Sequence, residues 1–562
     1  MDIKELDNFL EITETNLNLV LSSILSDISI NDTINTSASI YTDTTIDKWI
    51  SKLPITRGGS IVIDKIIKNP INNKELLLER QKTNFNISSY HLNILKTTEK
   101  DLLWIMNLKE DIEDDMSINL LFPSTYLINK LNNFRTFLDL YHLYKIIFMP
   151  LTCIIYPLSI IITPFYYLNK YMHLNLSFFK YLQILFQFLK IVLKPSGNLK
   201  KDLMKIISFL IYVFIYFYSI YQTFLISYII YKTREKLLIK IKGLVNFIKS
   251  SLVLIKQSNY NWLSYNIYNL TKEEVIQTVK NLEKINYDIS TIYKLWKNPI
   301  FKSSIITILK VVYTLDVINS ITNIKKNKYW NIPTYNNNHT KIWNLRNPLL
   351  SDNQIENPLN LNRNLIITGV NAGGKTTYVK SIASNIILSQ TFGIINGSKG
   401  ELMIYDAIIS FMRITDEIGK KSYFEAETDC CSNIIKIADN INKEKKRGIF
   451  ILDEPMHSTP PIEGMAVAYA IAKYLGNLEG ITIIITTHFH NLITLEENKE
   501  RFLNISVNGD DKFKFDYKIN KGSSKQTIAI ELLKKQKFND EIINSAIETK
   551  NKLCNENLRN DC

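Results

Sequence analysis

Two kinds of apolar run alternate with polar segments along this chain. The first kind is short, as in LIITG at 365–369, GIFILDE at 448–454 and ITIIITTH at 481–488. Runs of this length that are apolar almost throughout predict strands buried on both faces, as in a parallel sheet covered by helices. The C-terminal half of the chain is therefore predicted to be an α/β domain.

The second kind of apolar run is much longer. Residues 146–168 and 206–231 are stretches of 23 and 26 residues without a charge. A helix needs about 20 residues to cross the hydrocarbon of a bilayer, and both runs are rich in Tyr and Phe and flanked by Lys, as membrane interfaces favour. Pro150, Pro157 and Pro164 predict a kink in the first helix. We interpret the two runs as transmembrane helices.

The segment between these two runs leaves the topology open. Residues 169–205 contain seven Lys and one Asp, which the positive-inside rule keeps on the cytosolic side. Residues 176–194 mix Lys with aromatic residues, as a helix lying in the interface does. Two crossings and a re-entrant or interfacial hairpin are both compatible with the pattern. A buried helix pair inside a soluble α-domain is the third reading.

A glycine loop with the spacing G-x-x-x-x-G-K-[ST] follows the strand at 365–369. Glycines let backbone N–H groups point inward without a Cβ in the way, and the helix that begins near Lys375 directs its positive dipole end at the loop. This pattern predicts a site for ATP, with Lys375 reaching the β- and γ-phosphates and Thr376 ligating Mg²⁺. The predicted ATP-binding residues are Gly369, Val370, Asn371, Ala372, Gly373, Gly374, Lys375, Thr376 and Thr377.

The other two short runs end in groups suited to hydrolysis. Asp453, at the end of its strand, is predicted to hold the Mg²⁺ shell together with Thr376, and Glu454 to polarise an attacking water as general base. His488 follows the third strand and is placed to sense the γ-phosphate. Glu454, His488 and Lys375 are thus the predicted catalytic residues, and the predicted reaction is ATP hydrolysis.

These motifs resemble those of the MutS family of DNA mismatch repair ATPases. The loop GVNAGGKTTYVK is similar to the family's GPNMGGKSTYMR, with Val370 and Ala372 in place of Pro and Met. DEIGKKSYFEAETDCCSNII resembles the signature stretch DDLASGRSTFMVEM and keeps Ser422, Phe424 and Glu427. DEPMHSTPPIEG is similar to DEIGRGTSTYDG, and TTHFHNL to ATHYFEL. The resemblance covers residues 346–548 and extends upstream over 260–345 and 46–145.

The resemblance implies a P-loop NTPase of the ABC type at the C-terminus, preceded by an all-α core and lever domain with a hydrophobic helical insertion. In such engines two nucleotide domains sandwich ATP head to tail, so we expect a homodimer in which Ser422 reaches the partner's γ-phosphate. DNA is the partner that the family implies. The expected division is an N-terminal segment with a polar linker (1–45), the first part of the core (46–145), the insertion (146–231), returning lever helices (232–345), the ATPase domain (346–548) and a loose polar tail (549–562).

The place of the apolar insertion in the chain bears on the function of the protein. In MutS proteins the region between the start of the core and the returning lever holds the clamp that grips DNA, and here the apolar hairpin 146–231 fills that slot. The chain also begins almost directly at the core, so we expect it to lack the family's N-terminal mismatch-recognition domains. We expect a membrane-associated protein with its ATPase on the cytosolic side. A DNA-acting ATPase, a membrane-remodelling or transport ATPase, and an ATP-switched scaffold remain alternatives.

Charge and cysteines change this picture little. The net charge of +13 and the pI near 9.1 favour an anionic partner, either nucleic acid or an acidic membrane. A Lys-rich composition from an AT-rich genome explains the same charge. The five cysteines have no metal-ligand spacing and indicate reduced thiols. Residues 270–296 begin with a capping box and are predicted as one lever helix.

Overall fold

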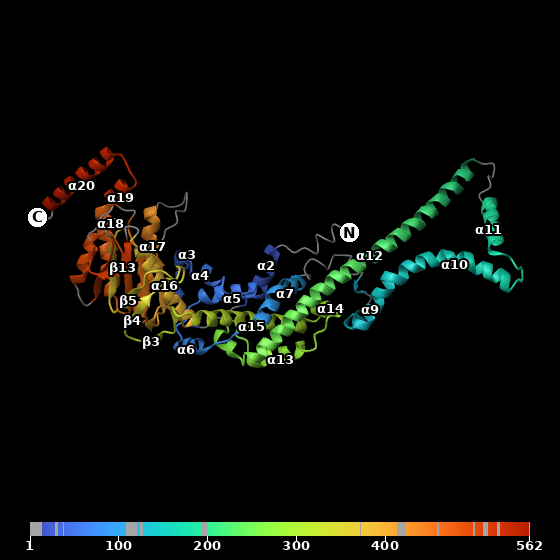
Figure 1. Cartoon of the computed structure of the whole chain (residues 1–562), viewed down its shortest axis with the longest axis horizontal. Coiled ribbons are helices and arrows are strands. Elements are labelled where there is room, and N and C mark those ends of the chain that lie inside the picture. The colour runs from blue at the N-terminus through green and yellow to red at the C-terminus, as the bar shows by residue number, and fades with distance from the viewer. Residues whose placement is uncertain are drawn as a thin grey trace. The chain divides into compact units, whose positions relative to one another are not determined.

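The structure is a computed structural model of the chain, whose elements are labelled in Figure 1. It describes residues 14–27, 32–37, 39–107, 121–123, 128–192, 199–370, 373–412, 423–457, 460–497, 501–509, 515–524 and 529–560. These residues fall into two compact units. The helical unit lies within 1–26, 89–253 and 272–309, and the sheet unit lies within 27–88, 254–271 and 310–562.

A seven-stranded sheet forms the centre of the sheet unit, in the order β1-β9-β10-β11-β6-β12-β13. Neighbouring strands are parallel except β12 and β13, which are antiparallel. The strands are Asn35–Thr36 (β1), Asn364–Gly369 (β6), Ala407–Phe411 (β9), Gly448–Asp453 (β10), Ile481–Thr486 (β11), Phe502–Gly509 (β12) and Phe515–Lys521 (β13). The three strands predicted from short apolar runs, β6, β10 and β11, are adjacent and almost entirely buried. Their carboxyl ends therefore meet at one edge of the sheet.

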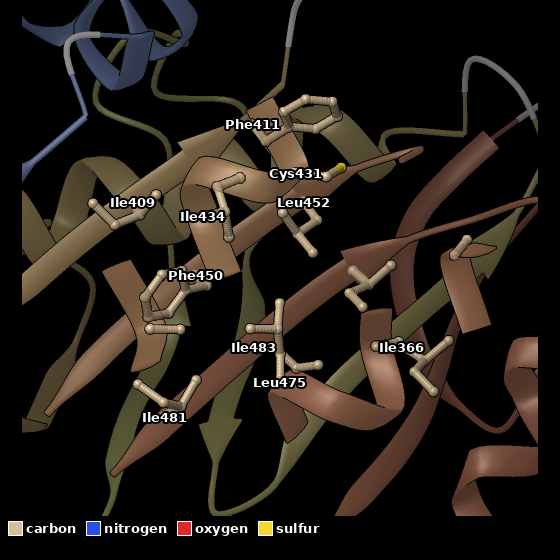
Figure 2. Packing of buried hydrophobic residues seen from close by; sticks show 14 of the residues in the cluster. Ile366, Ile409, Phe411, Cys431, Ile434, Phe450, Leu452, Leu475, Ile481 and Ile483 are labelled. Atoms are coloured by element: carbon tan, nitrogen blue, oxygen red, sulfur yellow. The ribbon is translucent and has the colours of Figure 1, made fainter. Parts of the chain in front are cut away.

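Helices enclose this sheet and make an α/β architecture. The side chains of α17 (Tyr423–Lys443) and α18 (Pro461–Asn477) form one cluster with β6, β9, β10 and β11, in which Phe450 and Leu452 of β10 alternate with residues outside it. Figure 2 shows Ile434 of α17 and Leu475 of α18 directed at Phe450 and Ile483 of the sheet. This alternation is what a strand buried on both faces produces.

Helix α16 (Lys375–Phe392) contacts β6, β10 and β11 and packs against short helices from the start of the sheet unit. Its residues from Ser381 to its end are all buried. The buried Arg80 of the adjoining helix donates from its guanidinium to the Thr391 carbonyl oxygen at 2.5 Å and to the Ser264 carbonyl oxygen at 2.8 Å. The short helices are Ser39–Thr44 (α3), Ile46–Ile50 (α4), Arg57–Ile67 (α5), Lys74–Lys82 (α6) and the 3₁₀ turn Asn261–Tyr265 (η3).

Smaller elements complete the sheet unit. A four-stranded sheet has the order β3-β8-β4-β5, and β2 pairs with β7. Strand β5 leads into the start of β6 through residues 362 and 363. The elements are Trp330–Asn331 (β2), Thr334–Asn336 (β3), Thr340–Leu345 (β4), Asn357–Leu361 (β5), Ile395–Asn396 (β7), Lys399–Met403 (β8), His490–Glu497 (η4), Ala529–Lys535 (α19) and Asp540–Asn560 (α20).

The helical unit contains a long helical hairpin. Helix α10 runs outward, α11 joins its far end to the start of α12, and α12 returns (Figure 1). Pro157 and Pro164 lie inside α10, which is visibly curved, and Pro150 lies in its first turn. The helices are Glu14–Ile24 (α2), Ser89–Asn107 (α7), Asn129–Asn133 (η1), Arg135–Leu143 (α9), the π-helical turn Tyr144–Phe148 (η2), Met149–Lys170 (α10), Phe178–Val192 (α11), Leu199–Gln257 (α12), Lys272–Leu282 (α13), Ser290–Lys297 (α14) and the start of Pro299–Lys325 (α15).

Three helices in the described part of the chain are long and apolar enough to cross a membrane, judged by length and composition alone. They are Arg135–Lys170, Lys200–Gln257 and Pro299–Lys325. The most apolar 18-residue segments of the first two helices are only 6% and 0% buried, whereas that of the third helix is 89% buried. The third helix is therefore a core helix, and the first two contain the apolar runs 146–168 and 206–231.

Three sequence expectations differ from the structure. Residues 31–45 were expected to be a linker, yet β1 pairs with β9 at the sheet edge and α3 packs beside it. The single lever helix expected over 270–296 is two helices, α13 and α14, because the turn-forming segment Asn286–Tyr287–Asp288 interrupts it and Asp288 accepts a bond from Ser290. The tail was expected to be loose from Thr549 onward, but α20 continues to Asn560, since no Gly or Pro stops it.

Candidate functional site

The glycine loop joins the end of β6 to the start of α16. Gly369 has φ +140°, and a Cβ there would lie 2.2 Å from the Val507 carbonyl oxygen. Gly374 has φ +100° and is the residue before the first turn of α16. Both positions therefore require glycine. The predicted loop residues Asn371 and Ala372 lie outside the described residues.

Lys375 lies across this loop and is 5% exposed. Its Nζ donates to the Gly369 carbonyl oxygen at 2.9 Å and lies 3.2 Å from His488 Nε2 and 3.7 Å from Glu454 Oε1. Burial lowers the pKa of the ammonium, while the neighbouring Glu454 and Asp453 carboxylates act in the opposite direction. A buried cation held at a helix N-terminus is suited to pairing with a polyanion.

Asp453 and Thr376 form a second group beside the lysine. The Thr376 hydroxyl donates to Asp453 Oδ2 at 3.0 Å, and the Thr486 hydroxyl donates to Asp453 Oδ1. A hydroxyl and a carboxylate side by side fit the protein share of a Mg²⁺ site, because Mg²⁺ keeps water and phosphate oxygens as its other ligands. The described residues hold no cluster of three or more His, Cys, Asp or Glu for a metal bound by protein alone.

Glu454 occupies a constrained backbone position next to this pair. Its φ is +53°, and its N–H donates to both the carbonyl oxygen and the hydroxyl of Thr486, at 3.1 and 3.0 Å. Glu454 Oε1 lies 2.8 Å from His488 Nε2. The bond to His488 holds the pKa of Glu454 below its usual value, with burial opposing and Lys375 assisting. The carboxyl is therefore ionised at neutral pH, as a general base must be.

A cavity of about 940 Å³ extends from these residues along the loop. It is lined on one side by Lys375, Thr376, Thr377 and Glu454, and on the other by side chains of β13 and of the segment before β5, including Phe515, Tyr517 and Ile355. Asn357, the first residue of β5, joins β5 to β13. Its side chain donates to the Tyr517 carbonyl oxygen and accepts from the Ile519 N–H, both at 2.9 Å. A cavity with a polar, cationic end and an aromatic end can hold a phosphorylated base.

Sequence reasoning missed the aromatic end of this cavity. Phe515 and Tyr517 follow the loop by about 140 residues and have no motif of their own. Thr486 was quoted in a motif without a role, although its hydroxyl and carbonyl position both Asp453 and Glu454. A polar residue at the end of an otherwise apolar strand was the signal that could have indicated it.

The signature stretch is only partly described. Ser422 lies outside the described residues. Glu427 on α17 is 2% exposed and accepts from the Met456 N–H at 2.5 Å. It therefore connects α17 to the turn that follows Glu454. Cys430 and Cys431 lie on the same helix, where burial raises the pKa of the Cys431 thiol to about 12, so it is unreactive.

A glycine loop, a lysine at a helix N-terminus, and carboxylates at the ends of neighbouring parallel strands form the arrangement typical of proteins that bind nucleoside triphosphates. Residues 365–554 match the family model of MutS domain V. Residues 365–554 therefore form a domain of the MutS family.

Curated relatives have the same family name. The chain is 28% identical over 246 residues to the DNA mismatch repair protein MutS of Persephonella marina, which covers 42% of this chain and 28% of that protein. It is 24% identical over 312 residues to the DNA mismatch repair protein MutS of Bacillus velezensis, and the matched region is 53% of this chain and 33% of that protein. The protein of that name from Fusobacterium nucleatum is 26% identical over 299 residues, and the matched region is 50% of this chain and 32% of that protein. The chain thus spans about a third of the length of the relatives it matches.

Proposed function

We propose that this protein binds and hydrolyses ATP with Mg²⁺. The observation that carries the proposal is the convergence of Lys375, Glu454 and His488 within 3.7 Å of one another at the carboxyl edge of the sheet, beside the Thr376–Asp453 pair. The match of residues 365–554 to MutS domain V supports the same reaction.

Each side chain has a role that follows from its position. Lys375 neutralises the β- and γ-phosphates, and the loop N–H groups together with the start of α16 hold them. Thr376 and Asp453 would hold Mg²⁺, which supplies charge neutralisation at the phosphates when bound. Glu454 accepts a proton from the attacking water, and His488 keeps that carboxylate ionised and oriented.

Hydrolysis is tested with Glu454→Gln, which keeps the size of the side chain but removes the base. We expect phosphate release to fall by about 10²- to 10⁴-fold while ATP binding is retained. Glu463→Gln, at an exposed position in the first turn of α18, is the matched control and should hydrolyse ATP at the wild-type rate. Unchanged phosphate release in Glu454→Gln would refute the assignment of the base.

We further propose a homodimer formed through the ATPase domains, in which Ser422 reaches the partner's nucleotide. The resemblance of the signature stretch supports this. In detergent with ATP and the Glu454→Gln change, which slows turnover, the measured mass should be that of two chains. A strict monomer under these conditions contradicts the proposed dimer.

DNA is the proposed partner, in a role related to mismatch repair or recombination, because the relatives are named DNA mismatch repair proteins. A DNA contact made by Lys and Arg should weaken steeply as salt rises. Titration of a labelled duplex at several salt concentrations measures this. Absence of DNA affinity at low salt favours a second function, in which the same engine serves a membrane or scaffold role without mismatch recognition.

The exposed apolar hairpin favours that second function. We propose that the hairpin associates with a membrane and that the ATPase domain lies on the cytosolic side. The apolar windows of α10 and α12 are 6% and 0% buried, whereas monomeric soluble proteins rarely expose contiguous apolar patches of more than a few hundred Å². Cell-free synthesis with vesicles, followed by flotation, tests the association. Protein that stays at the bottom of the gradient with every vesicle type contradicts it.

A further inference from the structure

The outer end of the hairpin combines an amphipathic helix with a strong excess of positive charge. Between 169 and 205 the sequence has seven Lys and one Asp, whereas the runs 146–168 and 206–231 on either side have no charge at all. The charge is thus confined to the end of α10, the start of α12 and the residues between them, which include α11. A charge boundary of this kind matches the boundary between hydrocarbon and headgroups.

Helix α11 has one narrow polar stripe. Lys180, Gln183, Gln187 and Lys190 recur at spacings of three and four residues and are all exposed. At 100° per residue they span only about 80° of the helix circumference. Other exposed side chains of α11 are large and apolar, namely Phe178, Phe179, Leu182, Ile184, Phe186, Phe188 and Ile191.

The face opposite the polar stripe is held against α10. Tyr181, 4% exposed, donates from its hydroxyl to the Ile161 carbonyl oxygen at 3.0 Å, and its ring packs on Phe165. The loop before α11 is closed by Asn169, which accepts from the Leu176 N–H at 2.7 Å and donates to the Leu176 carbonyl oxygen at 2.9 Å. The polar stripe is therefore fixed on the side of α11 that points away from the apolar helix α10.

Helix α12 is hydrogen-bonded to η2 and α10 at the inner end of the hairpin. The Tyr216 hydroxyl donates to the Cys153 carbonyl oxygen at 3.0 Å, and the Ser227 hydroxyl donates to the Lys145 carbonyl oxygen at 2.9 Å. These bonds join α12 to η2 and to the first turns of α10, and the two helices diverge beyond them (Figure 1). Phe209, Leu210, Phe214 and Phe217 of α12 nonetheless remain exposed. A second protein would have to enclose nearly the whole hairpin to cover such surfaces, whereas a bilayer does so by its nature.

We propose that α11 lies in the headgroup layer of a bilayer that contains anionic phospholipid, with Lys180 and Lys190 directed at the lipid phosphates and the flanking phenylalanines in the acyl chains. This inference rests on the membrane association proposed above and adds the depth and lipid class of the contact. The Lys190 Nζ lies 5.1 Å from the centre of the Phe186 ring, so positive charge and an exposed aromatic side chain lie side by side on α11, as in a helix at a membrane interface. DNA is the other polyanion that could bind the lysines, but DNA binding would not require the exposed phenylalanines of α11.

The lipid class is tested by flotation of the full chain made in a cell-free system. One set of vesicles is pure phosphatidylcholine, and in the other about a third of the lipid is phosphatidylserine. Wild type should float preferentially with the anionic vesicles, and Lys180→Gln with Lys190→Gln should reduce its partition to them by roughly 25-fold, since each lysine near an anionic surface contributes about fivefold. The matched control is Lys436→Gln with Lys443→Gln, which removes two exposed charges from α17 and should change nothing.

The outcomes separate the two proposals. Flotation of wild type with equal efficiency on both vesicle types leaves membrane association standing and overturns the anionic contact. Failure to float on any vesicle overturns both. If the Lys180→Gln and Lys190→Gln pair floats like wild type but loses DNA affinity in a gel-shift titration, the stripe binds DNA and the lipid assignment is wrong.

The depth of α11 is tested independently with Phe186→Trp. The six native tryptophans all lie outside 146–231, so the difference between variant and wild-type fluorescence reports on α11. Bromines near the headgroup end of the acyl chain should quench this signal more strongly than bromines near its terminal methyl, because interfacial helices lie about 5–10 Å below the headgroups. Stronger quenching by the deep bromines overturns the interfacial position.

Discussion

Helices α15 and α12 are similar in sequence character and opposite in environment. Both contain segments apolar enough to cross a membrane, yet the segment of α15 is 89% buried and that of α12 is 0% buried. The difference between them is in their polar groups. Mean hydropathy alone therefore does not distinguish a core helix from an exposed one.

The polar groups of α15 have partners in the sheet unit. Asp316 accepts from the Thr56 N–H at 2.9 Å, and Asn319 accepts from the Ile87 N–H at 2.9 Å. Near its end, Lys325 donates to the Thr83 carbonyl oxygen at 3.0 Å, and burial lowers the pKa of its ammonium to about 8. Such groups are tolerated inside a protein because each is hydrogen-bonded. The exposed half of α12, in contrast, has no charged residue between 206 and 231.

The largest expected effect separates the two regions by function. Lys375→Ala removes the ammonium at the glycine loop and should lower ATP hydrolysis by about 10³-fold or more, since a preorganised charge is lost where phosphate charge develops. Flotation with vesicles should be unchanged because the hairpin is untouched. Phosphate release and flotation are measured on the same preparation, with the exposed Lys473→Ala as control. Hydrolysis at the wild-type rate would show that the site is misassigned.

The next effect compares two phenylalanines of opposite burial. Phe450 of β10 is fully buried, and Phe450→Ala should lower the free energy of unfolding by about 3–5 kcal/mol because it leaves a cavity. Phe214 of α12 is 69% exposed, and Phe214→Ala in detergent should change it by less than about 0.5 kcal/mol. Urea unfolding in detergent, followed by circular dichroism, measures both. Equal losses would mean that α12 is packed in the protein.

A smaller effect is expected from Asp316 in the buried helix. Asp316→Ala leaves the N–H groups of Ile55 and Thr56 and the Thr56 hydroxyl without their acceptor, which should cost about 1–3 kcal/mol. Asp316→Asn keeps one acceptor oxygen and should cost less. The same unfolding assay ranks the two variants. If Asp316→Ala is as stable as wild type, the polar partners of α15 do not explain its burial.

The smallest effect concerns pH. The pKa of Glu454 in the folded protein lies below its ordinary value of 4.5. Its ionised form therefore stabilises the fold above pH 4.5, and this contribution is lost as the pH falls through the folded pKa. The difference in Tm between wild type and Glu454→Gln should shrink on acidification below pH 4.5. A difference that grows on acidification contradicts the direction of the pKa shift.

Much of the sheet and of its loop could be predicted from sequence. Strands β6, β10 and β11 are short apolar runs, and a parallel sheet buried on both faces has few alternatives for such runs. The loop spacing around Gly369 and Gly374 was equally informative, because only glycine fits the backbone conformations found there. The strand-end groups Asp453, Glu454 and His488 could be proposed as neighbours for the same reason: parallel strands end at one edge.

Other features had no local signal. The pairing of β1 with β9 joins residues about 370 positions apart, and its two residues, Asn35 and Thr36, are polar. The aromatic end of the cavity depends on Asn357 holding β13 in place. Asn357 and Phe515 are far apart in sequence, and neither position has a pattern that predicts the other.

The sequence by itself determined which segments are apolar, with what period, and where glycine and charge interrupt them. These properties select strand, helix and loop because they act over a few residues. Only the tertiary structure decided that Thr486 positions Asp453 and Glu454, that α15 is enclosed while the first half of α12 is exposed, and that the polar stripe of α11 faces away from α10. Each of these depends on which distant residues supply a hydrogen-bond partner or cover an apolar side chain, and that is settled only when the chain packs.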